Sequence, residues 1–435
     1  MATAVTRIRP CATPNGSPPD PHVDSIDVAG RGPSRALRKR LVADLAARGL
    51  LPTKRVRDAF MAVPRERFVP VLAAELGLDA IHEDQVHVTH RDKDGQSISS
   101  FEQPALIAAM LECLQVEAGH RILEIGSGTG YTAALLAHLA GPTGHVTSIE
   151  VDGTVAEEAR GHLARGRHRV QVVQGDGMLG WAGNAPYDRI VVTAQPQSLP
   201  RSWWEQLCPD GLIQVPLRID VLRMGVGLVI TFRRRPDGLV SVAHTWGQFM
   251  GFRAPGAAGA PDQPWPLLGA WTLGTGRRNT RMMVSGPALA RLSKAGRGQL
   301  LALLLNGHQQ RLLDIRDSAA ATLLCALAGP RARLMVVREL DTEGIGLLDP
   351  SLQGFAVLLP HAPTKAGSSR MALRSYGDGG RAADELLTLV DGWRRLGAPG
   401  LNQFEFSVAF GPHPAGNQWH LPPLGECRIG ARLAT

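Results

Sequence analysis

The sequence predicts a doubly wound α/β fold, in which helices cover both faces of a largely parallel sheet. Short apolar runs alternate with helical patterns of about ten residues, and this alternation is typical of a parallel sheet. The predicted strands are 122–125, 146–149, 170–173, 188–193 and 212–216. The predicted helices between them are 131–140, 154–165 and 200–208. A glycine-rich turn directly after the first strand supports the same fold, because nucleotide-binding sheets join strand to helix in this way.

Helices precede this sheet and a hairpin follows it. The preceding helical patterns begin near Ala36 and recur over 56–63 and 103–115. Residues 224–232 and 238–246 flank a Pro-Asp-Gly turn, which predicts an antiparallel hairpin. Residues 1–33 are rich in Pro, Gly, Ser and Asp without periodicity, and we expect a disordered tail there.

A change in composition after the hairpin divides the chain. Residues 254–266 are a Pro/Gly/Ala-rich segment, which we interpret as a linker. The sequence therefore predicts one domain over 34–253 and a second, α+β domain over 267–435. In the second domain we expect helices at 287–305 and 380–396, with strands near 333–338, 355–359 and 404–410.

The composition is that of a soluble globular protein, with 44% hydrophobic and 20% charged residues in 435. No apolar run reaches the roughly 18 residues that a membrane helix needs, and no signal peptide is apparent. Five widely spaced cysteines without a CxxC pair predict neither a disulfide framework nor a zinc site. The cysteines fit a reducing cytoplasm, and we expect a monomer there without a membrane partner. The net charge of +8 comes with abundant arginine and little lysine, which indicates a compositional bias more than a nucleic-acid-binding protein.

Three consecutive strand ends carry glycine or a carboxylate. The first strand runs into the alternating glycines Gly126, Gly128 and Gly130, which let the backbone approach a nucleotide closely. The second ends in Glu150, twenty residues beyond Gly130, where a carboxylate can accept both hydroxyls of a ribose. The third runs into Gly175-Asp176-Gly177, where Asp176 could reach an adenine edge. The pattern predicts an adenosine-cofactor site.

Several segments match one family in order and spacing. They are PRERFVP at 64–70, QSIS at 96–99 followed by Gln103-Pro104, and LEIGSGTGY at 123–131. Over about 38–253 the chain resembles protein-L-isoaspartate O-methyltransferases. The resemblance implies a class I methyltransferase sheet, S-adenosyl-L-methionine as cofactor and a carboxyl group as methyl acceptor. The cofactor-binding residues that it implies are Ser99, Glu124, Gly126, Ser127, Gly128, Thr129, Gly130, Glu150, Val151, Gly175, Asp176, Gly177 and Thr193.

The chain departs from this family in two places. Ser100, Phe101 and Glu102 are inserted in the loop expected to touch the acceptor, and about 180 residues follow the methyltransferase core. In this respect the chain resembles longer methyltransferases of lanthipeptide and other ribosomal-peptide maturation systems. We therefore expect esterification of an aspartate in a modified precursor peptide, leading to succinimide or isoaspartate. The alternative is repair of isoaspartyl proteins.

Methyl transfer to a carboxylate makes modest chemical demands. The acceptor is already ionised at neutral pH and is itself the nucleophile, so no strong general base is needed. Hydroxyl groups can orient a carboxylate without neutralising it. Ser99 is the first candidate for this catalytic role and Thr193 the second, while Ser100 could replace Ser99 because of the insertion. His82, His87 and His90 lie close together in the sequence, but we expect no metal site there.

Overall fold

The chain is described from a computed structural model. It describes residues 32–253 except 94, 197, 219–226 and 248, and beyond them the segments 270–275, 278–285, 308–315, 333–339, 342–351, 353–361, 370–400, 403–412 and 427–434, with a few single residues between. The linker predicted at 254–266, most of the helix predicted at 287–305 and all but the end of the tail predicted at 1–33 lie outside the described residues.

Short helices and a two-stranded hairpin precede the main sheet. The helices are α1 (Pro33–Ala47), α2 (Lys54–Ala62), η2 (Arg65–Phe68), α3 (Pro70–Leu76), α4 (Leu78–Ile81) and α5 (Pro104–Leu114). Between α4 and α5, the strands β1 (His87–Arg91) and β2 (Ser97–Phe101) pair antiparallel. The segment carrying Ser100 and Phe101, which the sequence predicts as a loop, is therefore the end of a strand. Its partner β1 contains no glycine or proline, but its polar sequence hides the strand pattern.

The predicted doubly wound sheet is confirmed. Its parallel strands are β3 (Arg121–Ile125), β4 (His145–Glu150), β5 (Val170–Gln174), β6 (Tyr187–Val192) and β7 (Leu207–Arg218). The helices between them are α6 (Tyr131–Ala140), α7 (Gly153–Arg165) and α8 (Arg201–Gln206). The predicted helix 200–208 is too long, because Leu207 already pairs with Tyr187 of β6. Chain order reverses between β3 and β6, and ligands bind at such reversal points in α/β sheets.

Alternating side chains place two cores on opposite faces of this sheet. Ile122 and Val191 pack with the apolar faces of α1, α2, α5 and α6. Their neighbours Leu123 and Ile190 point the other way, into a core that includes Trp203 of α8. This two-residue period is what a strand buried on both faces requires. Both cores fix the carboxyl ends of β3, β4 and β6 as a rigid rim.

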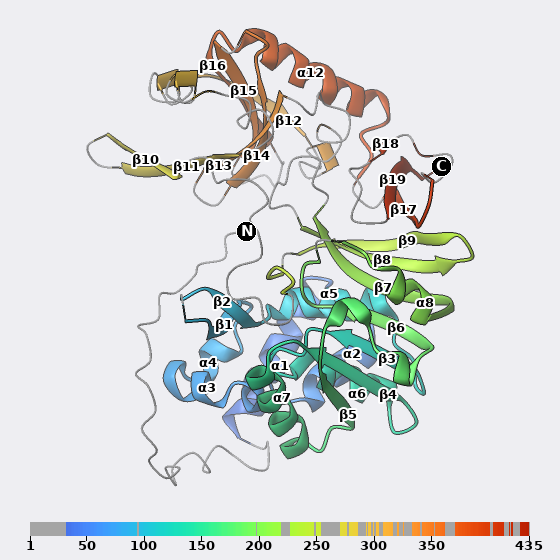
Figure 1. Ribbon diagram of the computed structural model, residues 1–435. Helices are drawn as coiled ribbons and strands as arrows, with labels where there is room; N and C mark the ends of the chain where they lie inside the picture. The colour runs from blue at the N-terminus through green and yellow to red at the C-terminus, as the bar shows by residue number, and fades with distance from the viewer. Residues whose placement is uncertain are drawn as a thin grey trace.

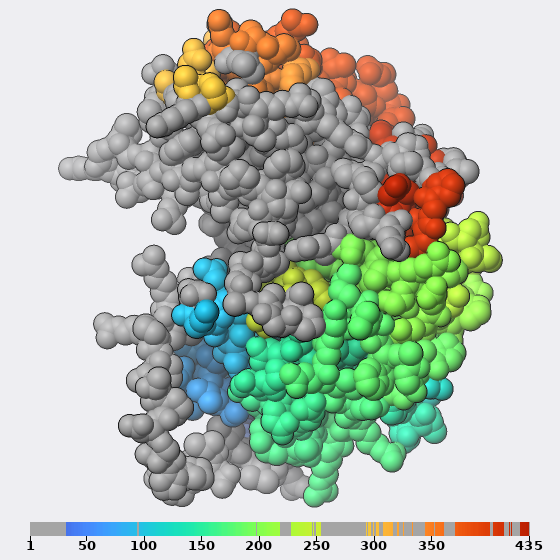
Figure 2. Space-filling model, viewed as in Figure 1, coloured from blue at the N-terminus to red at the C-terminus, as the bar shows by residue number. Residues whose placement is uncertain are grey.

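The C-terminal region completes the sheet instead of folding wholly apart from it. The hairpin β8 (Gly227–Arg235) and β9 (Gly238–Trp246) extends the sheet beyond β7, and β17 (Phe404–Ala409) pairs antiparallel with β9. β19 (Arg428–Leu433) and β18 (Trp419–His420) follow, giving ten strands (Figure 1). Phe404 and Phe406 join the core that β8 lines. In Figure 2 these C-terminal strands, in red, lie against the green hairpin residues.

A second sheet carries the remaining described strands. It has seven strands in the order β10-β11-β13-β14-β15-β16-β12. Their bounds are Ala270–Thr275, Arg278–Ser285, Leu334–Glu339, Thr342–Leu348, Gly354–His361, Arg370–Gly377 and Gln309–Asp314. Helix α12 (Gly380–Arg395) packs on β14–β16 through an apolar face that includes Leu386 and Trp393 (Figure 1). Among the described residues, no helix is both long and apolar enough to span a bilayer.

Candidate active site

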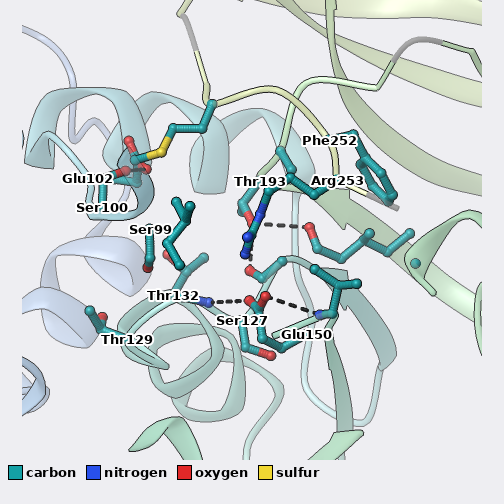
Figure 3. A pocket seen from close by; sticks show the side chains of 18 of the residues that line it. Ser99, Ser100, Glu102, Ser127, Thr129, Thr132, Glu150, Thr193, Phe252 and Arg253 are labelled. Carbon is teal, nitrogen blue, oxygen red and sulfur yellow. Dashed lines mark hydrogen bonds between the residues drawn. The ribbon is translucent and has the colours of Figure 1, made fainter. Parts of the chain in front are cut away.

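A cavity opens at the carboxyl ends of β3, β4 and β6, where the chain order of the sheet reverses. One wall is the turn 126–129 after β3, and the opposite wall is β2 with Ser99, Ser100 and Glu102. Residues 250–253, after the β8–β9 hairpin, close a third side. Figure 3 shows Ser99, Ser127 and Glu150 around this cavity.

The glycine turn fits the sequence expectation in detail. Gly126 has a φ of +100° and Gly128 a φ of +50°, a region that favours glycine. A Cβ on Gly126 would lie 2.6 Å from Oγ1 of Thr193, and a Cβ on Gly128 would lie 3.7 Å from the carbonyl oxygen of Ser100 and 3.8 Å from Oγ of Ser99. Glycine at these positions therefore lets the turn pack closely against Thr193 and β2 while residues 126–129 line the cavity.

Glu150 ends β4 and ties the turn in place. Its carboxylate accepts hydrogen bonds from the backbone N–H groups of Gly128 (3.1 Å), Val151 (3.0 Å) and Asp152 (3.2 Å). Burial raises the pKa of Glu150, while these donors and the nearby charge of Arg253 oppose that change. Oε1 accepts the bonds from Val151 and Asp152, and Oε2 accepts only the bond from Gly128. One acceptor site therefore stays free on Oε2, where this buried carboxylate can still accept from a ribose hydroxyl. A carboxylate acceptor beside the glycine turn fits the ribose of an adenosine ligand.

Four residues implied by the family resemblance do not line the cavity: Glu124, Gly130, Gly175 and Asp176. Glu124 is fully buried behind the turn, where it accepts a hydrogen bond from Ser148, and burial raises its pKa to about 8. Ser148 in turn shares a 2.6 Å hydrogen bond with Ser127. Asp176 accepts from the backbone N–H of Met178. Glu124 thus supports the turn through Ser148, and Asp176 caps the short helix η3 (Gly177–Leu179). The remaining implied residues, Ser99, Gly126–Thr129, Glu150, Val151, Gly177 and Thr193, line the cavity itself.

The three candidate hydroxyls differ in their bonding. Ser99 is 7% exposed, and its Oγ has no hydrogen-bond partner among the described residues. Ser100 donates to the carboxylate of Glu102. Thr193 donates to the carbonyl oxygen of Gly126 at 2.6 Å and lies 3.1 Å from that of Ile125, so it joins two strand ends. Only Ser99 keeps a free hydroxyl for a ligand, and the geometry favours a structural task for Thr193.

Arg65 explains why the PRERFVP segment lies close to this site. Its side chain is buried, with the guanidinium carbon 4.1 Å from the ring centre of Phe101 and 4.9 Å from that of Tyr131. It donates to the carbonyl oxygens of Ile81 and Glu102. Burial lowers the pKa of Arg65, which still carries its charge. The inserted Phe101 is thus packed between an arginine and the core, and it anchors β2.

Two charged residues of the cavity, Glu102 and Arg253, are not among the site residues that the sequence predicts. Arg253 forms an ion pair with Asp152 at 3.6 Å. Two backbone hydrogen bonds, from Phe252 to Gln195 and from Gln195 to Met250, hold the segment 250–253 beside the residues that follow β6. Arg253 therefore lies in the wall of the cavity. Phe252 also lines the cavity, whereas Phe249 is buried in the core. The side chain of Trp246 is outside the described part of the chain.

His82, His87 and His90 are close together in the sequence, but each contacts a different partner. His82 lies 3.5 Å from Glu66, His87 contacts the carbonyl oxygen of Ala80 at 3.3 Å, and His90 lies 3.1 Å from Glu158. Across the described residues, no group of three or more potential metal-ligating side chains is assembled.

Comparison with known proteins shows the family to which this chain belongs. The profile of "Protein-L-isoaspartate(D-aspartate) O-methyltransferase (PCMT)" matches residues 36–244. The protein-L-isoaspartate O-methyltransferase of Ignicoccus hospitalis is 35% identical over 209 residues, which are 47% of this chain and 90% of the relative. The chain belongs to the protein-L-isoaspartate O-methyltransferase family.

Two further proteins that are similar to this chain carry the name of the same family. Protein-L-isoaspartate O-methyltransferase 1 of Rhodopseudomonas palustris is 43% identical over 187 residues, covering 42% of this chain and 71% of the relative. A solved structure titled protein-L-isoaspartate O-methyltransferase aligns with 86% of this chain and 96% of its own, at 26% identity and a TM-score of 0.47. As a member of this family the chain is a carboxyl O-methyltransferase that acts on protein or peptide substrates, and its cofactor is S-adenosyl-L-methionine.

Proposed function

We propose that this methyltransferase esterifies the free carboxylate of L-isoaspartyl residues in proteins or peptides. The observation that carries this proposal is the unpaired, buried hydroxyl of Ser99, which lines the cavity beside Gly128. A carboxylate that enters between β2 and the turn would receive a hydrogen bond from Ser99. The sequence match over residues 36–244 supports the same acceptor.

The cavity residues divide the work of binding and orientation. The bound S-adenosylmethionine supplies a methyl group activated by a positively charged sulfur. The turn at Gly126–Thr129 and the carboxylate of Glu150 hold the adenosine end, while Ser99 orients the acceptor. Because the acceptor carboxylate is the nucleophile, catalysis depends on holding its oxygen in line and excluding water. No side chain has to remove a proton.

The ester has a chemical fate that needs no further enzyme group. The backbone nitrogen that follows the esterified residue attacks the ester carbon, the C–N bond forms, and methanol leaves with the nitrogen's proton. The resulting succinimide then hydrolyses to aspartate or isoaspartate. Only a flexible backbone around the residue is required.

A second candidate acceptor is the aspartate of a ribosomally made modified peptide of the lanthipeptide type. The observation that favours it is the inserted end of β2, where Ser100 and Glu102 line the acceptor side of the cavity. The seven-stranded sheet also adds surface that a small repair core does not need, and we propose that it recognises the peptide. We further propose a cytoplasmic monomer, with residues 34–253 as the methyltransferase unit.

Two matched peptides distinguish these acceptors. The peptides share one sequence and differ only in carrying isoaspartate or aspartate, and methyl transfer is followed by mass spectrometry. Transfer to the isoaspartyl peptide alone supports repair. Transfer to neither simple peptide, but to an aspartate in a thioether-bridged peptide, supports the maturation role. If no carboxylate of any of the three peptides is methylated, the proposed function is wrong.

A further inference from the structure

Glu102 is a carboxyl group on the acceptor side of a cavity that receives a carboxylate. It follows β2 directly and is half-buried, and its side chain lines the cavity together with Ser99 and Ser100. Ser100 donates its hydroxyl hydrogen to one oxygen of Glu102. Figure 3 shows Glu102 and Ser100 together on one side of the cavity, with Ser99 nearer the turn.

The surroundings of Glu102 disfavour its negative charge. Burial raises its pKa to about 7, while the Ser100 hydrogen bond and the positive charge of Arg65 act in the opposite direction. Arg65 donates to the backbone carbonyl of Glu102, and the described residues give the Glu102 carboxylate no ion-pair partner. The other ionisable groups around it are Tyr131 beneath β2, Arg253 on the far wall, and Asp84, which pairs with Arg48.

We propose that Glu102 is an acceptor-orienting residue, whose protonated carboxyl donates a hydrogen bond to one oxygen of the substrate carboxylate. The other substrate oxygen is then free to attack the methyl group. This inference rests on the proposed function only in requiring a carboxylate acceptor, either isoaspartate or aspartate. It assigns a task to a residue that is inserted relative to the family motif.

The physical reason is that two carboxylates at hydrogen-bond distance cannot both stay charged. One proton shared between them gives a short, charge-assisted hydrogen bond, which is stronger than a bond between neutral groups. The arriving substrate charge raises the proton affinity of Glu102 further. Ser100 holds the second oxygen of Glu102, so the proton-bearing oxygen can face the acceptor. A protonated Glu102 is also a poor methyl acceptor, which protects the enzyme from methylating itself.

The test measures kcat and KM for the peptide acceptor from pH 5.5 to 9 in the full-length protein. In the wild type, kcat/KM should fall as the pH rises through about 7. Glu102→Gln remains a neutral hydrogen-bond donor, so it should keep activity within about tenfold and lose this fall. Glu102→Ala should raise the acceptor KM about ten- to a hundredfold, the effect of one lost hydrogen bond to a charged group. The affinity for S-adenosylhomocysteine should stay unchanged.

Glu117→Gln, an exposed carboxyl far from the cavity, is the matched control and should leave the pH profile as in the wild type. The inference is overturned if Glu102→Gln keeps the wild-type fall in activity, or if Glu102→Ala leaves the acceptor KM within twofold. A wild-type enzyme that methylates no carboxylate would refute the proposed function itself, and this inference with it. Normal binding of S-adenosylhomocysteine by each variant shows that it is folded.

Discussion

The backbone N–H of Gly128 donates a 3.1 Å hydrogen bond to the carboxylate of Glu150. This bond joins the end of β4 to the turn after β3, so two neighbouring strand ends move as one unit. Glu150 also accepts from Val151 and Asp152, at the start of α7. The carboxylate that can hold the ribose is therefore the same group that fixes the turn beside it.

Glu150→Ala should weaken the binding of S-adenosylhomocysteine about ten- to a hundredfold, because a charged hydrogen-bond acceptor is lost. Isothermal titration calorimetry measures this change. Glu157→Ala, an exposed carboxylate on α7, is the matched control and should bind as the wild type does. Equal affinities in the two variants would remove Glu150 from the cofactor site.

Ser99→Ala should lower kcat for the peptide acceptor while leaving the affinity for S-adenosylhomocysteine nearly intact, because the task proposed for Ser99 is to orient the acceptor. Losing one hydrogen bond to a charged acceptor predicts a fall of about ten- to a hundredfold in kcat/KM. Ser100→Ala provides the comparison. Ser100→Ala also removes the hydrogen bond that Ser100 donates to Glu102. If Ser99→Ala keeps full activity while Ser100→Ala does not, Ser99 is not the orienting residue.

Thr193→Ser should retain both activity and stability, whereas Thr193→Val should lose about 1 kcal/mol of stability. The reason is that the Thr193 hydroxyl donates to the carbonyl of Gly126, and serine keeps this donor. Thermal unfolding and the S-adenosylhomocysteine affinity report the change. If Thr193→Val is as stable as the wild type but cannot methylate the acceptor, Thr193 orients the substrate after all.

Glu124→Gln should change how stability depends on pH. Burial raises the pKa of Glu124 to about 8, so between pH 5 and 8 the folded protein binds more protons here than the unfolded chain does. The stability that Glu124 contributes is therefore present at low pH and is lost as the pH rises through 8. Relative to the wild type, Glu124→Gln should gain roughly a few kcal/mol between pH 5 and 9. Urea unfolding of both proteins at pH 5 and at pH 9 measures their free energies of unfolding. A difference between the two proteins that is the same at both pH values would contradict the prediction.

Phe406→Ala should destabilise the methyltransferase sheet, although Phe406 lies 153 positions beyond Arg253. Phe406 is fully buried in the same core as β8, and removing such a ring costs about 3–5 kcal/mol. The apparent melting temperature should fall together with S-adenosylhomocysteine binding at elevated temperature. Leu396→Ala, at an exposed position after α12, serves as the control. For the same reason, a chain cut after Arg253 would leave β9 paired with β8 but without its second partner, β17.

Most of the family motif could be assigned from sequence because its residues are close together in the chain. Gly126, Gly128 and Glu150 lie at the ends of strands whose apolar runs are easily recognised in the sequence. Because the carboxyl ends of parallel strands meet at one edge of a sheet, this position in the chain predicts their position in the fold. The β1–β2 hairpin could not be predicted in this way. The polar strand β1 is held by pairing with β2 and by Phe101 against Arg65, which are contacts between distant segments.

The sequence alone determined the doubly wound sheet, the glycine turn and the acidic end of β4, because strand period and turn chemistry are local properties. Tertiary structure alone decided which charged groups complete the cavity: it brings Glu102 and Arg253, about 150 residues apart, to facing walls. It also decided that β17 pairs with β9 across more than 150 residues. Backbone hydrogen bonding between strands carries no sequence code of its own, so only the packed chain selects that partner.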